Sequence, residues 1–146
     1  MTKNVKGILT FIALLPATLL LVAAFAPYTT STSESIVVES GVDKVYPIIS
    51  NPEKLPFQHK SNTHLRKSVK NERLELVEKY RFGGVNFNLE HNFEFRTQKN
   101  KTRIKWTVRN DVYFPLNIYH YFLKKELIRK QEKESKQLRE HISLAE

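Results

Sequence analysis

The sequence contains no cysteine, one tryptophan and only four glycines among its 146 residues. Without cysteine the chain forms no disulfide, has no thiol nucleophile, and cannot hold an iron–sulfur cluster or a Cys-ligated zinc ion. The few glycines exclude a collagen-like chain, and a hydrophobic content of 40% is too high for a disordered tail. This length permits one folded domain and little else.

Acidic residues are scarce as well, with 15 of them against 24 lysines and arginines, so the formal net charge is +9. The basic excess is spread along the chain and interleaved with acids rather than massed in one arm. This distribution is typical of solvated strand and helix faces, with attraction to anionic lipid headgroups as the alternative. Nucleic acid is not an expected partner, because its recognition requires clustered basic residues.

A long uncharged run occupies residues 7–26 and would span about 30 Å as a helix, the thickness of a bilayer's hydrocarbon core. Lys3 and Lys6 precede the run, and no further lysine or arginine appears before Lys44. The positive-inside rule then places the N-terminus in the cytoplasm and exports the rest of the chain. We therefore predict a cytoplasmic stub at 1–6, a single transmembrane anchor at 7–26, a linker at 27–32 and an exported domain at 33–146.

A cleaved signal peptide is the alternative interpretation of the same run. Ala24-Phe25-Ala26 has the small-x-small pattern of a cleavage site. Pro27 would directly follow the cut, however, and the apolar run is longer than the ~7–15 residues usual in signal peptides. Both interpretations export the domain, and the uncleaved anchor is favoured.

Within the domain, residues 33–40 predict a strand that Gly41 ends, and 42–49 show the 3–4 residue spacing of a short helix. Asn51-Pro52 is typical of a helix cap followed by proline in the first turn, so a second short helix is expected there. Further strands are expected at about 64–69, 72–82, 85–96 and 102–114.

Gly83-Gly84 predicts a two-residue hairpin turn, because glycine readily takes positive φ at both positions. The turn pairs Phe82 with Val85, and a second turn after residue 98 pairs Phe95 with Ile104. In this register apolar side chains share one face of the sheet and charged side chains share the other, so one face is buried. The predicted buried face includes Leu74, Leu76, Tyr80, Phe82, Val85, Phe87, Leu89, Phe93, Phe95, Ile104, Trp106, Val108, Val112 and Phe114.

From residue 115 to the end the apolar pattern changes to the helical period. An apolar stripe runs through Leu116, Tyr119, Leu123, Leu127, Leu138, Ile142 and Ala145. The basic residues of this segment are predicted to lie off the stripe: Lys124, Lys125, Arg129, Lys130, Lys133 and Lys136. We expect the stripe to pack on the concave face of the sheet, because Gln131 and Glu134 interrupt the seam that a coiled-coil dimer would need.

Two segments resemble a known family. Residues 34–53, ESIVVESGVDKVYPIISNPE, are similar to the opening of the SRPBCC (START-like, polyketide cyclase/dehydrase) superfamily, and NKTRIKW at 100–106 resembles its Gly-Thr-x-Val-x-Trp strand. The resemblance implies an α+β helix-grip fold, in which a curved antiparallel sheet wraps a long C-terminal helix. It also implies a hydrophobic pocket between sheet and helix for a lipid, a polyketide or another apolar ligand. Few members are enzymes, and they share no catalytic motif that can be transferred.

Polar residues interrupt the predicted buried face at Glu78, His91 and Asn110. The register makes Glu78 and His91 diagonal neighbours, able to hold a ligand's polar end or to act with His91 as base and Glu78 orienting it. The alternative is a satisfied structural pair, and Asn110 marks a bulge or the sheet edge. The remaining predicted pocket residues are Leu76, Tyr80, Phe87, Leu89, Phe93, Trp106, Val108, Leu123 and Leu127.

Tyr113, Tyr119, His120 and Tyr121 cluster before the last helix, where they line the pocket mouth, lie at a bilayer interface or pack in the core. No metal site is expected from His59 and His64, and no motif indicates a cofactor. The leading hypothesis is a membrane-tethered domain that binds a hydrophobic ligand or lipid. The alternatives are a cyclase/dehydrase-type enzyme and a ligand-free scaffold that presents its surface to another envelope protein.

Overall fold

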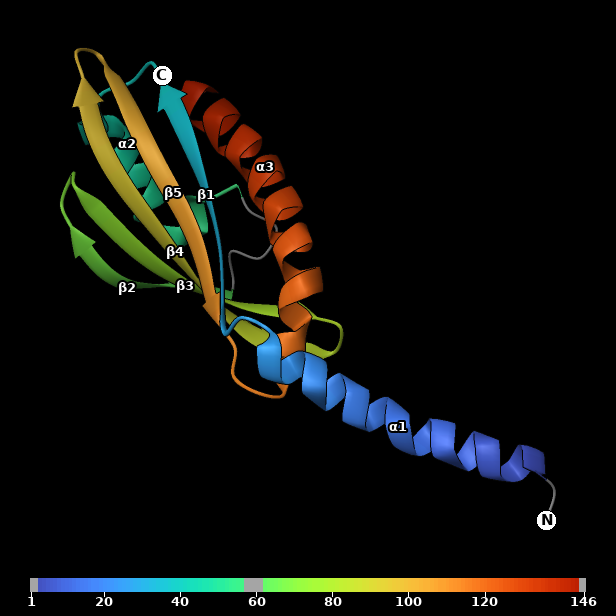
Figure 1. Ribbon diagram of the computed structural model, residues 1–146. Coiled ribbons are helices and arrows are strands. Elements are labelled where there is room, and N and C mark those ends of the chain that lie inside the picture. Colours follow the sequence, from blue (N-terminus) through green and yellow to red (C-terminus); the bar gives the residue numbers. More distant parts are fainter. Residues whose placement is uncertain (1–2, 57–61, 145–146) are drawn as a thin grey trace.

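A computed structural model describes residues 3–56 and 62–144 of the chain (Figure 1). A long N-terminal helix leads into a single sheet, two short helical segments follow the first strand, and a long helix ends the chain. In order the elements are α1 (Lys3–Phe25), β1 (Thr29–Val38), α2 (Val42–Ile49), the 3₁₀ turn η1 (Pro52–Lys54), β2 (Thr63–Val69), β3 (Arg73–Phe82), β4 (Val85–Gln98), β5 (Lys101–Asp111), the 3₁₀ turn η3 (Leu116–Tyr119) and α3 (His120–Leu144).

The strands form one antiparallel sheet in the order β1-β5-β4-β3-β2. Helix α3 runs along the sheet beside β1. Helix α2 lies near the end of the strands that is farther from α1 (Figure 1). Helix α1 extends away from the domain (Figure 1). A sheet with one covered face and a long C-terminal helix is the predicted α+β helix-grip arrangement.

The predicted hairpin register is confirmed. Phe82 pairs with Val85 across the glycine turn, and Phe95 pairs with Ile104 between β4 and β5. Gly83 and Gly84 have φ angles of +56° and +82°, which glycine adopts without the steric cost that a Cβ imposes. Because the side-chain period of a strand is two, this register decides which residues enter the core.

The core lies between the sheet and the two helices. Phe93 and Trp106 are fully buried with stacked rings whose centroids are 5.2 Å apart. Leu123, Leu127 and Leu138 of α3 are at most 1% exposed, so the predicted apolar stripe does pack on the sheet. Burying each such side chain contributes about 1.5–3 kcal/mol, so this contact stabilises the domain.

The two short helices predicted after the first strand are also observed, as α2 and η1. Residues 42–49 form α2, with Val45 and Ile49 fully buried. Asn51 caps η1 through its Oδ1, which accepts a hydrogen bond from the backbone N–H of Glu53 at 3.1 Å.

The structure corrects the prediction at both ends of the domain. Strand β1 begins at Thr29 rather than at residue 33, because residues 29–32 pair with the end of β5, so most of the predicted linker 27–32 is strand. Phe114 and Leu116, expected on the buried face and stripe, are 49% and 44% exposed. Here β5 ends at Asp111 and the chain turns through η3 before α3 begins, so neither strand nor helix periodicity extends through residues 112–119.

The run predicted as a membrane anchor folds as helix α1. Over the residues that the structure describes, no helix combines the length and the apolar character needed to cross a membrane. The C-terminal end of α1 is held by the domain, because the fully buried Asn117 donates from Nδ2 to the carbonyls of Ala23 and Ala26 at 2.6 and 2.8 Å. One side chain of η3 thereby donates to two carbonyl groups at the end of α1.

Candidate functional site

The residues predicted to line a pocket lie together in the core, on the inner face of the sheet and on the facing side of α3. Tyr80 is half-buried at the margin. All the other apolar members are at most 4% exposed: Leu76, Phe87, Leu89, Phe93, Trp106, Val108, Leu123 and Leu127. Because these side chains pack against one another, a ligand could touch all of them only if α3 moved away from the sheet.

Glu78 and His91 form the contact that the register predicts. His91 Nε2 lies 3.0 Å from Glu78 Oε2, and both side chains are at most 4% exposed. On its other side, His91 Nδ1 accepts a hydrogen bond from Trp106 Nε1–H at 3.3 Å. Because an indole N–H only donates, these partners assign the neutral tautomer with its proton on Nε2, donating to Glu78.

Lys130 also contacts this pair, although the sequence pattern does not predict that contact. Its Nζ donates to Glu78 Oε2 at 2.8 Å and lies 2.9 and 3.1 Å from the carboxylate oxygens of Glu134. The Lys130 side chain is only 12% exposed. The prediction that Lys130 lies off the apolar stripe is wrong: it follows Leu123 by seven residues, and that spacing is the signal that places both on one face of the helix.

Burial and charge set the pKa values of this network in different directions. Burial raises the pKa of Glu78, but the hydrogen bond from His91 and the charge of Lys130 outweigh it, so the net pKa is below the ordinary value. Burial raises the pKa of Glu134 above its ordinary value, and Lys130 offsets this only in part. Burial lowers the pKa of Lys130, but the charges of Glu134 and Glu78 raise it overall. The network therefore favours a charged Lys130–Glu78 pair beside a carboxyl that binds protons more readily.

Two other buried polar residues of α3, Gln131 and Ser135, have a partner on the sheet. Gln131 Nε2 donates to the backbone carbonyl of Trp106 at 2.8 Å, and Ser135 Oγ donates to Glu34 Oε1 at 2.7 Å. These bonds explain how a helix with an interrupted apolar seam still packs on a sheet, because buried polar groups cost little when they are paired. They also fix the position of α3 along β1 and β5.

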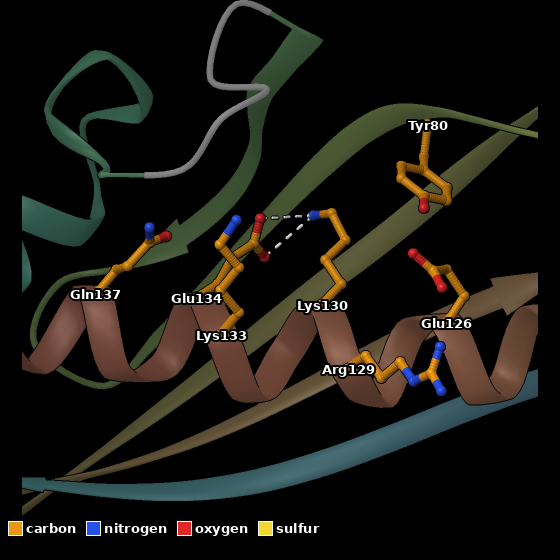
Figure 2. Close-up of a pocket in the computed structure, with 7 residues that line it drawn as sticks. All are labelled: Tyr80, Glu126, Arg129, Lys130, Lys133, Glu134 and Gln137. Atoms are coloured by element: carbon orange, nitrogen blue, oxygen red, sulfur yellow. Dashed lines mark hydrogen bonds and ion pairs between the residues drawn. The ribbon is translucent and has the colours of Figure 1, made fainter.

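A hollow of about 230 Å³ lies between α3 and β3, next to this network. Apart from Tyr80, its lining comes entirely from α3, and the side chain of Lys130 points toward that of Glu134 (Figure 2). Lys130 Nζ also lies 5.6 Å from the centroid of the Tyr80 ring. We call this space the α3–β3 hollow; it is lined by Tyr80, Glu126, Arg129, Lys130, Lys133, Glu134 and Gln137.

Unpaired acceptor atoms lie in and beside the hollow. The Oε1 atoms of Glu78 and Gln137 are buried and accept no hydrogen bond from the described residues. Buried oxygens without a donor cost free energy, so a donor supplied from outside the chain would be bound favourably. Burial and the neighbouring Glu126 also raise the pKa of Tyr80, which keeps its phenol protonated and able to donate.

The remaining predicted residues lie elsewhere. Asn110 is a buried member of β5 rather than a bulge, and its Nδ2 donates to the carbonyl of Asn88 at 2.8 Å. Tyr119 packs on the hairpin tip, with its ring 5.9 Å from that of Phe87, whereas Tyr113 and Tyr121 are exposed. His120 Nδ1 lies 2.7 Å from the hydroxyl of Thr30, near the start of β1.

Of the histidines weighed as metal ligands, His64 is exposed on β2. His59 lies outside the described residues. Among the described residues no group of three potential ligands comes together.

Comparison with solved structures shows the fold. A conserved protein from Geobacillus kaustophilus superposes with a TM-score of 0.61 at 12% identity, over 79% of this chain and 96% of that one. A protein from Chromobacterium violaceum gives a TM-score of 0.57 at 10% identity, over 77% and 96%. The di-domain ARO/CYC protein StfQ of the steffimycin biosynthetic pathway gives 0.51 at 9% identity, over 80% of this chain and 52% of that one.

No family model and no curated protein matches the sequence. The helix-grip fold predicted from residues 34–53 and 100–106 is therefore supported by structural similarity and not by sequence similarity.

Proposed function

We propose that the chain is a membrane-attached binding domain that takes the polar end of a small hydrophobic molecule into the α3–β3 hollow. The fold supports a ligand-binding or cyclase-type domain, since one structural neighbour is the ARO/CYC protein StfQ. The position of the hollow supports binding at the margin between helix and sheet. The ligand's apolar part would meet Tyr80 and the side chains that border it.

The observation that carries this proposal is the buried ion network beside the hollow. Lys130, Glu78 and Glu134 have side chains that are 12%, 3% and 6% exposed. Charges removed from water to this degree rarely stabilise a fold better than apolar residues of similar size would. A network of this kind at the edge of a hollow, next to unpaired oxygens, is what a site for a polar group requires.

The size of the hollow limits the ligand. Its 230 Å³ is below the roughly 300–1,000 Å³ of pockets that enclose drug-sized molecules. The hollow therefore accommodates a polar end group bearing a hydroxyl or amine, which can donate to Gln137 Oε1. A longer apolar part would have to remain outside it, or enter the core as α3 shifts.

The geometry favours binding over catalysis. A histidine base needs an imidazole nitrogen whose lone pair is accessible to substrate. In His91 the Nδ1 lone pair accepts from Trp106, and Nε2 carries the proton donated to Glu78. The role of His91 is therefore to hold Glu78 in place for Lys130.

Membrane attachment is proposed through α1. Apart from Ala23, the apolar side chains described along the helix are exposed, including Phe11 at 67%, Leu21 at 62% and Phe25 at 81%. Apolar surface of this extent favours lipid as its environment. Lys3 and Lys6 lie in the first turn of α1, and on the positive-inside rule we propose a cytoplasmic N-terminus and an exported domain.

The binding test uses the full chain, purified in mild detergent and examined by native mass spectrometry for molecules carried from the expression host. We expect a bound small molecule that is lost in Lys130→Met and retained in Lys136→Met, a matched change at an exposed position of the same helix. Retention of the molecule in Lys130→Met would place its site elsewhere.

A ligand-free scaffold is the second candidate, and close packing favours it. Trp106, Phe93, Leu123 and Leu127 are at most 1% exposed and pack under α3. If no bound molecule is found and none of a panel of fatty acids, phospholipids and polyphenols changes the stability of the full chain, the scaffold is the better account.

The attachment test relies on the absence of cysteine, since a single introduced thiol labels without background. Ser68→Cys lies on the exposed strand β2. In intact cells, labelling of Ser68→Cys by a membrane-impermeant maleimide is expected if the domain is exported. Labelling only after lysis would refute that orientation.

A further inference from the structure

Aromatic side chains surround the point where α1 leaves the domain. Six of them are between 49% and 81% exposed, and we call them the junction patch: Phe25, Tyr28, Tyr113, Phe114, Tyr121 and Phe122. Exposed aromatic residues gathered on one surface are unusual, because single scattered ones are the norm in water. The patch therefore indicates a surface that is covered in use.

Hydrogen bonds bring the segments that carry the patch together. The backbone N–H of Val112 donates to the carbonyl of Tyr28 at 2.7 Å, and the rings of Tyr28 and Tyr113 are 6.3 Å apart. Asn117 holds the end of α1, and His120 bonds to Thr30. These contacts fix the patch relative to α1, so the helix and the domain present it as one surface.

The surroundings of the patch match the headgroup region of a bilayer. Phe25, a member of the patch, is the last residue of α1, a helix that exposes apolar side chains such as Leu21. Tyrosine rings have an apolar body and a polar hydroxyl and are enriched at membrane–water interfaces. Lys124 and Lys125 follow the patch on α3 and are exposed, which suits anionic headgroups. Of the acids close by in the chain, Asp111 is already bound by Arg109 and Thr29, and Glu126 is only partly exposed.

We infer that the junction patch is a membrane-docking surface that lies among the headgroups of a bilayer containing anionic lipids. This inference rests on the proposed attachment through α1 and adds a second contact, made by the domain itself. Since Asn117 fixes α1 to η3, docking would orient α3 and the α3–β3 hollow relative to the lipid. A ligand could then pass between bilayer and hollow without release of the domain.

Depth-dependent quenching tests the inference in the full chain, reconstituted in vesicles of phosphatidylcholine and phosphatidylglycerol with brominated acyl chains. The native Trp106 is fully buried and reports folding in every sample. Phe122→Trp adds a probe within the patch, and Leu65→Trp adds a control probe on β2 at a position that is 46% exposed. We expect the lipid to remove most of the added fluorescence of Phe122→Trp and to leave Leu65→Trp unchanged.

Charge reversal gives a second measurement. Lys124→Glu with Lys125→Glu, introduced into Phe122→Trp, should reduce quenching in anionic vesicles more than in pure phosphatidylcholine. If this variant is quenched equally in both kinds of vesicle, docking of the patch does not require anionic lipid.

Each other outcome is decisive. If the chain floats with the vesicles but Phe122→Trp is not quenched, attachment through α1 stands and docking of the patch is refuted. If lipid does not quench Phe122→Trp and the chain also cross-links as a dimer, a second copy covers the patch instead. If the chain does not float, the attachment and this inference fail together, while binding in the hollow is tested separately by mass spectrometry.

Discussion

Replacing Lys130 by methionine is the sharpest test of the buried network. Methionine keeps an unbranched side chain of similar length, so the change removes the charge with little loss of packing. Glu78 and Glu134, only 3% and 6% exposed, are then left without their common cation. Removing one partner of a buried ion pair costs about 3–5 kcal/mol of unfolding free energy, a large part of the roughly 5–15 kcal/mol typical of a domain.

The assay is urea unfolding of the full chain in one detergent, followed by the fluorescence of Trp106. This is the only tryptophan in the sequence, and it is fully buried beside His91, so its emission reports the core and the network together. Lys136→Met is the matched control on the solvent side of α3 and should stay within about 0.5 kcal/mol of the native chain.

A double variant separates the ion pair from other effects of the substitution. Combining Glu78→Gln with Lys130→Met removes both charges, so its cost should be smaller than the sum of the single costs by about 0.5–3 kcal/mol. Strict additivity, or a Lys130→Met variant as stable as Lys136→Met, would refute the argument that the network is buried and coupled.

Further predictions concern the turn, the helix cap and acid stability. Gly83→Ala should cost about 1–2 kcal/mol, because φ is positive and the new Cβ would lie 2.9 Å from the Tyr119 ring; Gly84→Ala, with open space, should cost less in the same urea assay. Asn117→Ala should leave the buried carbonyl of Ala26 without its side-chain donor, at a cost of about 1–3 kcal/mol, and speed proteolysis after α1, and unchanged cleavage would contradict the cap. Because the pKa of Glu78 is lowered by folding, its stabilisation holds at neutral pH and is lost as pH falls below about 4.5 through the folded pKa. Glu78→Gln should flatten this acid loss, and an identical pH profile of unfolding free energy would show that another group controls it.

The strand pairing followed from local sequence alone. Gly83-Gly84 permits one tight turn, and from that turn the period of two assigns Leu76, Tyr80 and Phe93 to the core without further information. The helical stripe through Leu123, Leu127 and Leu138 was equally readable, because its apolar spacing has one sheet face available to cover it.

The prediction was wrong where the domain joins α1, because local patterns compete there. Thr29 to Thr32 carry no apolar alternation, so their pairing with the end of β5 could not be seen until the sheet existed. Phe114 and Leu116 fit the strand and helix periods but lie where the chain turns around Pro115, and they remain exposed.

The candidate site divides in the same way. Sequence by itself determined that Glu78 and His91 meet inside the sheet, because both lie on one hairpin whose register a short turn dictates. That Lys130 enters the core, that Trp106 occupies the second nitrogen of His91, and that a hollow opens beside Tyr80 were decided only by the tertiary structure. The reason is physical: a hairpin's contacts depend on neighbours in the chain, whereas the seating of α3 depends on how all the side chains between helix and sheet pack at once.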